Sequence, residues 1–246
     1  MQEKISVFAT VTAAVQGVFR NLGELASKAA VPFAVSTLLL LIWVELFYGD
    51  EVLSVAVQWL LLLRGLPHAW FALACHRVCL EELEIGCADT GRTSVFEFLL
   101  WSTIASALIM LPELLVPGGV GGLVDFLSFF GAVSVSVRYC LILPAIAAGE
   151  RANLSTASKR SSGNAWRLFW MFALVYSLAF IPMMIFVFVS APFPLPEEPL
   201  LQTETSAHFG LMILYQLAEY FGLALGAFGV CHAFAQLRSK AAPSAE

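Results

Sequence analysis

Long, continuous apolar runs constrain the fold of this chain more than any other feature. Six of them lie at about 31–48, 52–80, 95–116, 123–138, 165–190 and 208–236, separated by polar or Pro/Gly-rich connections. About 20 mainly apolar residues are enough for a helix to cross a bilayer. Within lipid the backbone must be hydrogen-bonded inside the spanning element, so only helices and closed barrels cross. Because these runs do not alternate in polarity, we predict six transmembrane helices.

The composition excludes an ordinary soluble domain. Hydrophobic residues make up 59% of the 246 residues and charged residues 13%, and the mean hydropathy is +0.83. Soluble domains are roughly 45–50% apolar and about 25% charged. The predicted fold class is therefore all-α: an integral membrane bundle of six transmembrane helices, with an N-terminal amphipathic helix and a short interfacial helix between the fourth and fifth spans.

The chain divides into three predicted parts: an amphipathic interfacial helix over 1–30, a transmembrane domain over 31–237 and a disordered cytoplasmic tail over 238–246. In the first part apolar residues recur at three- and four-residue steps, which is typical of a helix with one apolar face. They are Ile5, Phe8, Val11, Val15, Val18, Phe19, Leu22 and Leu25. We expect the first span to begin at Pro32, and a Ser/Thr-rich basic helix over about 153–163 to precede the fifth span.

The distribution of basic residues predicts the orientation. Of the 13 Lys and Arg residues, all except Arg64 fall in segments that the six-helix arrangement places on one side of the membrane. Cytoplasmic loops carry an excess of Lys and Arg, so this side is predicted to be cytoplasmic. Both termini are then inside. We expect an inner-membrane, multi-pass protein without a removable signal peptide, whose first span acts as the signal.

Ionisable residues inside the predicted spans are the first candidates for function, because a charge in the membrane is costly. Arg64 and Glu219 both fall near the predicted midplane and form a candidate buried ion pair. Glu45, nearer the outer face, can compete for Arg64, while Arg138 and Glu97 lie toward the inner face. Two interpretations stay open: the charges fix the register of the helices, or they line a path for a substrate or a proton.

The connection between the fourth and fifth spans combines hydroxyl and basic side chains at headgroup depth. Its candidate contacts to anionic lipid headgroups are Arg151, Lys159, Arg160 and Arg167. Basic clusters beside a membrane attract anionic lipids, and arginine pairs well with phosphate. A simple topology anchor is the alternative interpretation.

No motif predicts a metal site, a cofactor or a catalytic centre. The segment Cys75-His76-Arg77-Val78-Cys79 offers three soft ligands on one helix, but they do not share a face and no second set follows. The five cysteines are odd in number and lie in or near apolar helices, so a disulfide framework is not expected. On the sixth span Ala218, Gly222 and Gly226 form a seam of small residues that permits close helix packing.

Three strings resemble a known family. They are Ala74-Cys-His-Arg-Val-Cys-Leu-Glu-Glu82, Arg138-Tyr-Cys-Leu-Ile-Leu-Pro-Ala145 and Ser162-Gly-Asn-Ala-Trp-Arg-Leu-Phe169. The chain resembles the YciC-like six-helix bacterial inner-membrane proteins, which are relatives of the membrane domain fused to glycerophosphodiester phosphodiesterases. It departs from their pattern at Cys75, where an aromatic residue is expected, and at Glu81-Glu82. The resemblance implies a fold and an inner-membrane location but no established activity, since the phosphodiesterase chemistry belongs to a separate soluble barrel.

These features predict a non-enzymatic protein that acts in envelope or lipid homeostasis through lipid or protein contacts. The alternative is a small permease that uses Arg64 and Glu219. An intramembrane enzyme is the weakest of the three classes, because no pairing of a nucleophile with a base occurs. The expected partners are membrane lipids, anionic ones among them, and a membrane-protein partner or a second copy of the chain. Nothing in the sequence supports nucleic-acid binding.

Overall fold

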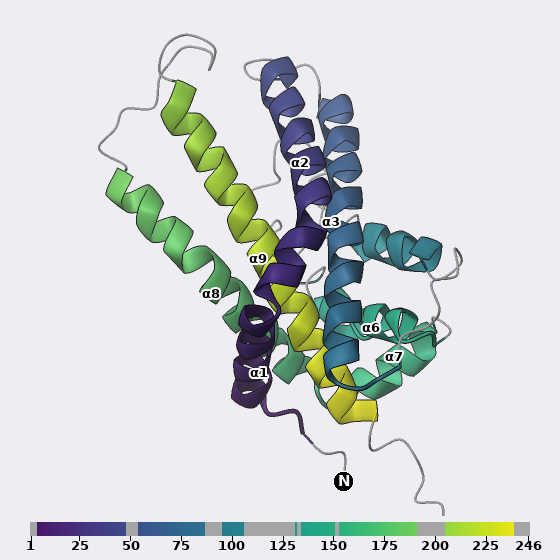
Figure 1. The fold of residues 1–246 in the computed structure, drawn as a ribbon. Coiled ribbons are helices and arrows are strands. Elements are labelled where there is room, and N and C mark those ends of the chain that lie inside the picture. The colour runs from purple at the N-terminus through teal and green to yellow at the C-terminus, as the bar shows by residue number, and fades with distance from the viewer. Residues whose placement is uncertain are drawn as a thin grey trace, which may run out of the picture.

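A computed structural model describes residues 4–47, 54–86, 95–105, 131, 134–150, 153–190 and 205–238. These residues are mainly helical and contain no strand, so the all-α class is confirmed for them (Figure 1). The principal helices are α1 (Val7–Arg20), α2 (Leu22–Phe47), α3 (Ser54–Glu82), α6 (Ile142–Ala147), α7 (Leu154–Ser161), α8 (Ala165–Ser190) and α9 (Thr205–Arg238). Two shorter apolar helical stretches cover Val95–Ala105 and Ser134–Ala147, the second of which ends with α6.

Some of these helices are long and apolar enough to cross a membrane. Within the described residues two qualify, Leu22–Ile42 and Met212–Arg238, and a third is added if α7 and the first part of α8, which meet at a bend of 87°, count as one span. α3 covers most of the second predicted span but is not among them, and the side chains of its residues 54–62 lie outside the described ones. The third and fourth predicted spans lie partly outside the described residues. The count of six therefore stays a prediction.

Helix α9 is the central element of the bundle. It packs against α8, α1 and α3, with further contacts to α2 and α6 (Figure 1). Within its span candidate 67% of the residues are buried, whereas the corresponding share in α2 is 17%. Its buried face includes Leu225, Phe228, Cys231 and Phe234. The apolar residues of α2 therefore face outward, while those of α9 form the core.

The N-terminal helix differs from the predicted one. Instead of one amphipathic helix over 5–29 and a span that starts at Pro32, the chain breaks at Asn21, and Pro32 lies inside α2. The break is held by Glu82 at the end of α3, which pairs with Arg20 and accepts a hydrogen bond from Asn21 Nδ2 at 2.8 Å. The boundary predicted at residue 30 thus falls within a continuous helix, because a distant carboxylate sets the position of the break.

Helix α1 presents two apolar surfaces. Val11, Ala14 and Val18 are buried against the bundle, and Gly17 allows the closest approach: a Cβ placed there would lie 2.7 Å from Cδ1 of Phe228. Phe8 nevertheless remains 78% exposed, and Phe19 is exposed as well. The helix is therefore packed on the protein by one face, while it offers a second apolar stripe to its surroundings.

Two glycines and one asparagine shape the connection from α6 to α8. Gly149 (φ 80°) and Gly163 (φ 76°) adopt left-handed conformations that favour glycine. Asn153 caps α7, since its Oδ1 accepts from the backbone N–H groups of Ser155 at 2.9 Å and Thr156 at 3.4 Å. The Asn153-Leu154-Ser155 sequence thus serves as a helix start.

The seam of small residues on α9 lies against α8, as the sequence predicted for close helix packing. A Cβ at Gly222 would meet Ala179 at 3.3 Å and Tyr176 at 3.6 Å, and one at Gly226 would meet Phe172 at 3.9 Å. Because these glycines leave room for side chains of α8, the two helices run side by side.

Candidate functional site

A cluster of polar side chains lies between α2, α3 and α9, in the middle portions of these helices. Arg64 and His68 are one turn apart on α3, so they share one face. On α9, residues 215 and 216 lie about one turn before residues 219 and 220, and side chains of this group reach α3 and α2. We call this group the polar cluster; its members are Ser36, Arg64, His68, Tyr215, Gln216, Glu219 and Tyr220.

The ion pair between Arg64 and Glu219 is the centre of the polar cluster. Nη2 of Arg64 donates to Oε2 of Glu219, and the two side chains are only 12% and 21% exposed. The sequence placed these residues at matching depth, and the structure brings them together: Arg64 lies about 27 Å and Glu219 about 28 Å before the C-terminal end of its helix. Tyr215 lies beside this pair, since the Arg64 guanidinium is 5.9 Å from the centre of its ring.

His68 faces the same carboxylate from one turn further along α3. Its Nδ1 lies 2.9 Å from the carbonyl oxygen of Arg64, and its Nε2 lies 3.6 Å from Oε2 of Glu219. A carbonyl oxygen only accepts hydrogen bonds, so Nδ1 carries the hydrogen and donates it. In the neutral ring Nε2 is then an acceptor, which faces a carboxylate that is also an acceptor.

Tyr220 closes the polar cluster on the side of α2. Its hydroxyl lies 3.1 Å from Oγ of Ser36, and its ring packs against Phe33 and Phe71 at centroid distances of 5.3 and 5.0 Å. The ring of His68 is 5.1 Å away. Aromatic side chains therefore border the polar cluster on the side of α2.

Several buried polar atoms of the cluster lack hydrogen-bond partners among the described residues. Both amide atoms of Gln216, Nε of Arg64 and Nε2 of His68 are in this position. Gln216 is 0% exposed and lies beside His68, but no hydrogen bond of standard geometry joins them. Buried polar groups normally find a partner, and an unmet one costs about 1–3 kcal/mol. The polar cluster is thus a place where stability is reduced.

The remaining intramembrane candidates are not part of this site. The side chain of Glu45 lies outside the described residues, although its backbone belongs to α2. Arg138 is exposed, and no ion pair with Glu97 joins it in the part of the chain that the structure describes. The two residues that the sequence placed at the midplane therefore remain the charged core of the site.

The basic residues between α6 and α8 have different surroundings from those expected. Arg160 pairs with Glu150 at 2.7 Å and lies 5.2 Å from the ring centre of Phe234. Arg167 donates to the carbonyl oxygen of Ile5. Lys159 is exposed, and Arg151 lies outside the described residues. Two of the four candidate headgroup contacts are thus engaged within the protein.

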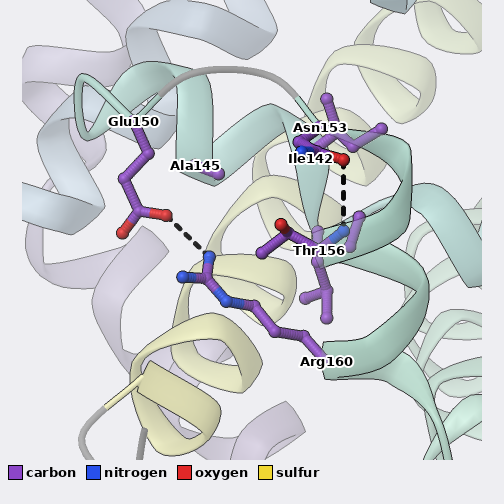
Figure 2. A pocket seen from close by; sticks show the side chains of 8 residues that line it. Ile142, Ala145, Glu150, Asn153, Thr156 and Arg160 are labelled. Atoms are coloured by element: carbon purple, nitrogen blue, oxygen red, sulfur yellow. Dashed lines mark hydrogen bonds and ion pairs between the residues drawn. The ribbon is translucent and has the colours of Figure 1, made fainter. Parts of the chain in front are cut away.

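Glu150 links α7 to the C-terminal end of α9. It accepts from Arg160 and also lies 3.3 Å from Nε of Arg238 at the end of α9. Figure 2 shows Arg160 reaching across a small pocket to Glu150, with Asn153 and Thr156 on the opposite wall. The two charged side chains that line the pocket, Glu150 and Arg160, already bind each other. The pocket therefore offers no free charge for a ligand.

The segment 162–169, the third of the strings that resemble the family, has a structural role. Oδ1 of Asn164 accepts from the backbone N–H of Ile5 at 3.0 Å, and Arg167 donates to the carbonyl of the same residue. The start of α8 thereby fixes the segment that leads into α1. We call the end of the bundle at which Glu82, Glu150 and Asn164 make these contacts the basic end, because arginines are the partners of the two glutamates.

Sequence reasoning found the charges of the polar cluster but missed its neutral members. His68 is one turn from Arg64, and Tyr215, Gln216 and Tyr220 are one turn or less from Glu219. This spacing was a usable signal, because polar residues at three- or four-residue steps from a buried charge share its face. The contribution of α2 through Ser36 had no such signal.

No family model, curated protein or solved structure matches this chain. The family resemblance therefore stays a prediction.

Proposed function

We propose that this chain is a non-enzymatic, six-span protein of the inner membrane, with both termini in the cytoplasm, which acts in envelope or lipid homeostasis through contacts with lipids or partner proteins. The proposal is supported by apolar helices that are long enough to cross a membrane and by the outward-facing apolar residues of α2 and α8. Water does not solvate such a surface favourably, whereas lipid does.

One observation carries the lipid-contact role: an exposed lysine lies close in sequence to exposed tryptophans at the bend between α7 and α8. Trp166 is 66% and Trp170 47% exposed. Lys159 is exposed and has no hydrogen-bond or ion-pair partner among the described residues. Tryptophan is enriched at headgroup depth, and a basic residue there attracts anionic lipid. An exposed lysine beside exposed tryptophans thus suits contact with the phosphate of a lipid headgroup.

Native mass spectrometry of the purified protein with an anionic phospholipid tests this role. We expect Lys159→Ala to retain less lipid than the wild type, because its ammonium group is free to bind phosphate. Lys28→Ala is the matched control, since Lys28 pairs with Glu24 at 3.3 Å on the exposed side of α2. Equal lipid retention by Lys159→Ala and the wild type would contradict the lipid-contact role.

The predicted orientation can be tested by itself. Cysteine labelling at Asp50, Val120 and Glu198 should report the outside, and labelling at Ala88, Thr156 and Lys240 should report the inside. A single reversed site would contradict the six-span arrangement.

A second candidate function, a small permease, is favoured by the polar cluster. A paired Arg64 and Glu219 are sufficient to fix helix register, but register alone gives no reason for the unmet amide of Gln216 in the same place. Polar residues within membrane helices commonly mark pathways for ions or substrates. The cluster combines donors and acceptors from three helices, which is the composition that such a pathway needs.

Complementation of a deletion strain distinguishes the permease from a structural pair. If the charges line a path, Arg64→Ala and Glu219→Ala should each give an inserted, folded protein that fails to complement, and the double variant should fail as well. If the charges only stabilise the bundle, the double variant should recover function. Full complementation by the double variant would exclude the permease.

A further inference from the structure

The side chains of His68 and Glu219 lie opposite each other, and this arrangement has a specific chemical consequence. Nδ1 of His68 donates to the carbonyl of Arg64, so Nε2 of the neutral ring presents a lone pair. That lone pair lies 3.6 Å from a carboxylate oxygen, which also presents lone pairs. Two acceptors that face each other repel weakly and leave Nε2 without a partner, as is observed. One proton between them converts this contact into a hydrogen bond.

The surrounding groups do not supply that proton by themselves. Arg64 already donates to Glu219. The other titratable groups around the pair are phenols: Tyr215 and Tyr220 on α9, and Tyr176 on α8 across from Gly222. From α2 the cluster receives the neutral hydroxyl of Ser36. None of these phenols loses its proton readily near neutral pH.

We propose that the polar cluster is a proton-binding site in which Nε2 of His68 and Oε2 of Glu219 share one proton taken from solution. Proton uptake adds one positive charge to the cluster and forms a hydrogen bond between α3 and α9. It also weakens the hold of Glu219 on Arg64, because a carboxylate that shares a proton attracts a guanidinium less. The guanidinium then becomes available to another anionic group.

This inference extends the second candidate function: in a permease, the bound proton would be the coupling ion. A role of this proton in transport therefore rests on that candidate function. Proton binding itself can be measured without any transported solute. The chain also contains an internal comparison. His76 has the same local arrangement, with Nδ1 2.7 Å from the carbonyl of Ala72, but its Nε2 is buried beside Phe98 and has no ion-pair partner among the described residues.

Solid-state NMR of the protein in lipid bilayers, with ¹⁵N-labelled histidine and ¹³C-labelled glutamate, tests the proposal. The chain has 4 histidines, and His68→Gln identifies the signal of His68 by its loss. On acidification we expect Nε2 of His68 to change from a bare to a proton-sharing nitrogen, in step with the carboxyl carbon of Glu219. In Glu219→Gln the midpoint for His68 should move to lower pH by about one unit or more.

Two further variants test whether the effect is specific to the pair of His68 and Glu219. His76→Gln should leave the titration of His68 unchanged. Glu219→Asp, which keeps the charge but withdraws it by one methylene, should shift the midpoint in the same direction by less. The inference is overturned if His68 does not titrate in the wild type, or if its midpoint is the same in Glu219→Gln. A coupled titration together with full complementation by Arg64→Ala/Glu219→Ala would exclude the permease and leave the proton site intact.

Discussion

The polar cluster and the basic end of the bundle use the same kinds of side chain in opposite ways. At the basic end, Glu150 contacts two arginines and Glu82 contacts Arg20 and Asn21. In the polar cluster, Glu219 has one arginine, and the neighbouring Gln216 has no partner for either amide atom among the described residues.

The difference teaches which polar groups stabilise the architecture and which reduce stability. Charges near the ends of the helices gain hydrogen bonds at a modest desolvation cost. Charges and amides in the middle of the helices pay more for burial and are not fully compensated. A group that is retained despite such a cost is a better candidate for function. The basic end therefore explains how the helices are held together, and the polar cluster is where function is expected.

The largest expected effect comes from breaking the central pair. Arg64→Ala leaves Glu219 buried without its cation and should lower the free energy of unfolding by about 3–5 kcal/mol. Arg64→Ala/Glu219→Ala should regain much of that loss, because no unpaired charge remains. Unfolding in mixed detergent micelles measures both values. Equal destabilisation in the single and double variants would contradict the pairing.

A smaller loss is expected at the basic end. Asn164→Ala removes the acceptor of the buried Ile5 N–H and should cost about 1–3 kcal/mol. Asn164→Asp is the control, since a carboxylate keeps an acceptor oxygen in the same place. Thermal unfolding gives the magnitude, and faster proteolysis near the N-terminus should accompany it. If Asn164→Ala unfolds like the wild type, the N-terminal segment is held by other contacts.

An effect of opposite sign is expected for Gln216. Gln216→Leu replaces an unmet buried amide by an apolar group of similar size and should raise the free energy of unfolding by about 1 kcal/mol. The same substitution should impair function if the polar cluster is a pathway. Stability and complementation are measured on the same variant. A destabilised Gln216→Leu would show that the amide is in fact satisfied, and the contrast between the two regions would weaken.

The smallest effect is expected at an exposed pair. Lys28 and Glu24 are one turn apart on α2 at 3.3 Å, and their side chains are well exposed. Lys28→Ala should change stability by less than about 0.5 kcal/mol, since exposed pairs contribute little. Thermal unfolding of Lys28→Ala, measured together with the other variants, shows how large the effect of an exposed charge is. A loss comparable to that of Asn164→Ala would mean that surface charges also hold the bundle.

The sequence placed Arg64 and Glu219 at matching depth as a candidate pair, because depth in a membrane can be counted along a helix. It did not name His68 or Gln216, although each is about one turn from a charge of the pair and shares its face. It gave no signal for Ser36, because the contact with α2 depends on how the helices pack together. The basic residues illustrate the same limit. Sequence position placed Arg160 and Arg167 at headgroup depth, but it did not reveal that Glu150 and the backbone of Ile5 bind them.

By itself the sequence determined the all-helical class and the apolar helices suited to a membrane, because hydrophobicity adds up segment by segment and needs no tertiary information. Only the tertiary structure decided where α1 ends, since Glu82 comes from α3, and which polar groups lie together between α2, α3 and α9. These outcomes depend on contacts between residues far apart in the chain. The energy of each such contact is set by the burial and geometry that the folded bundle provides.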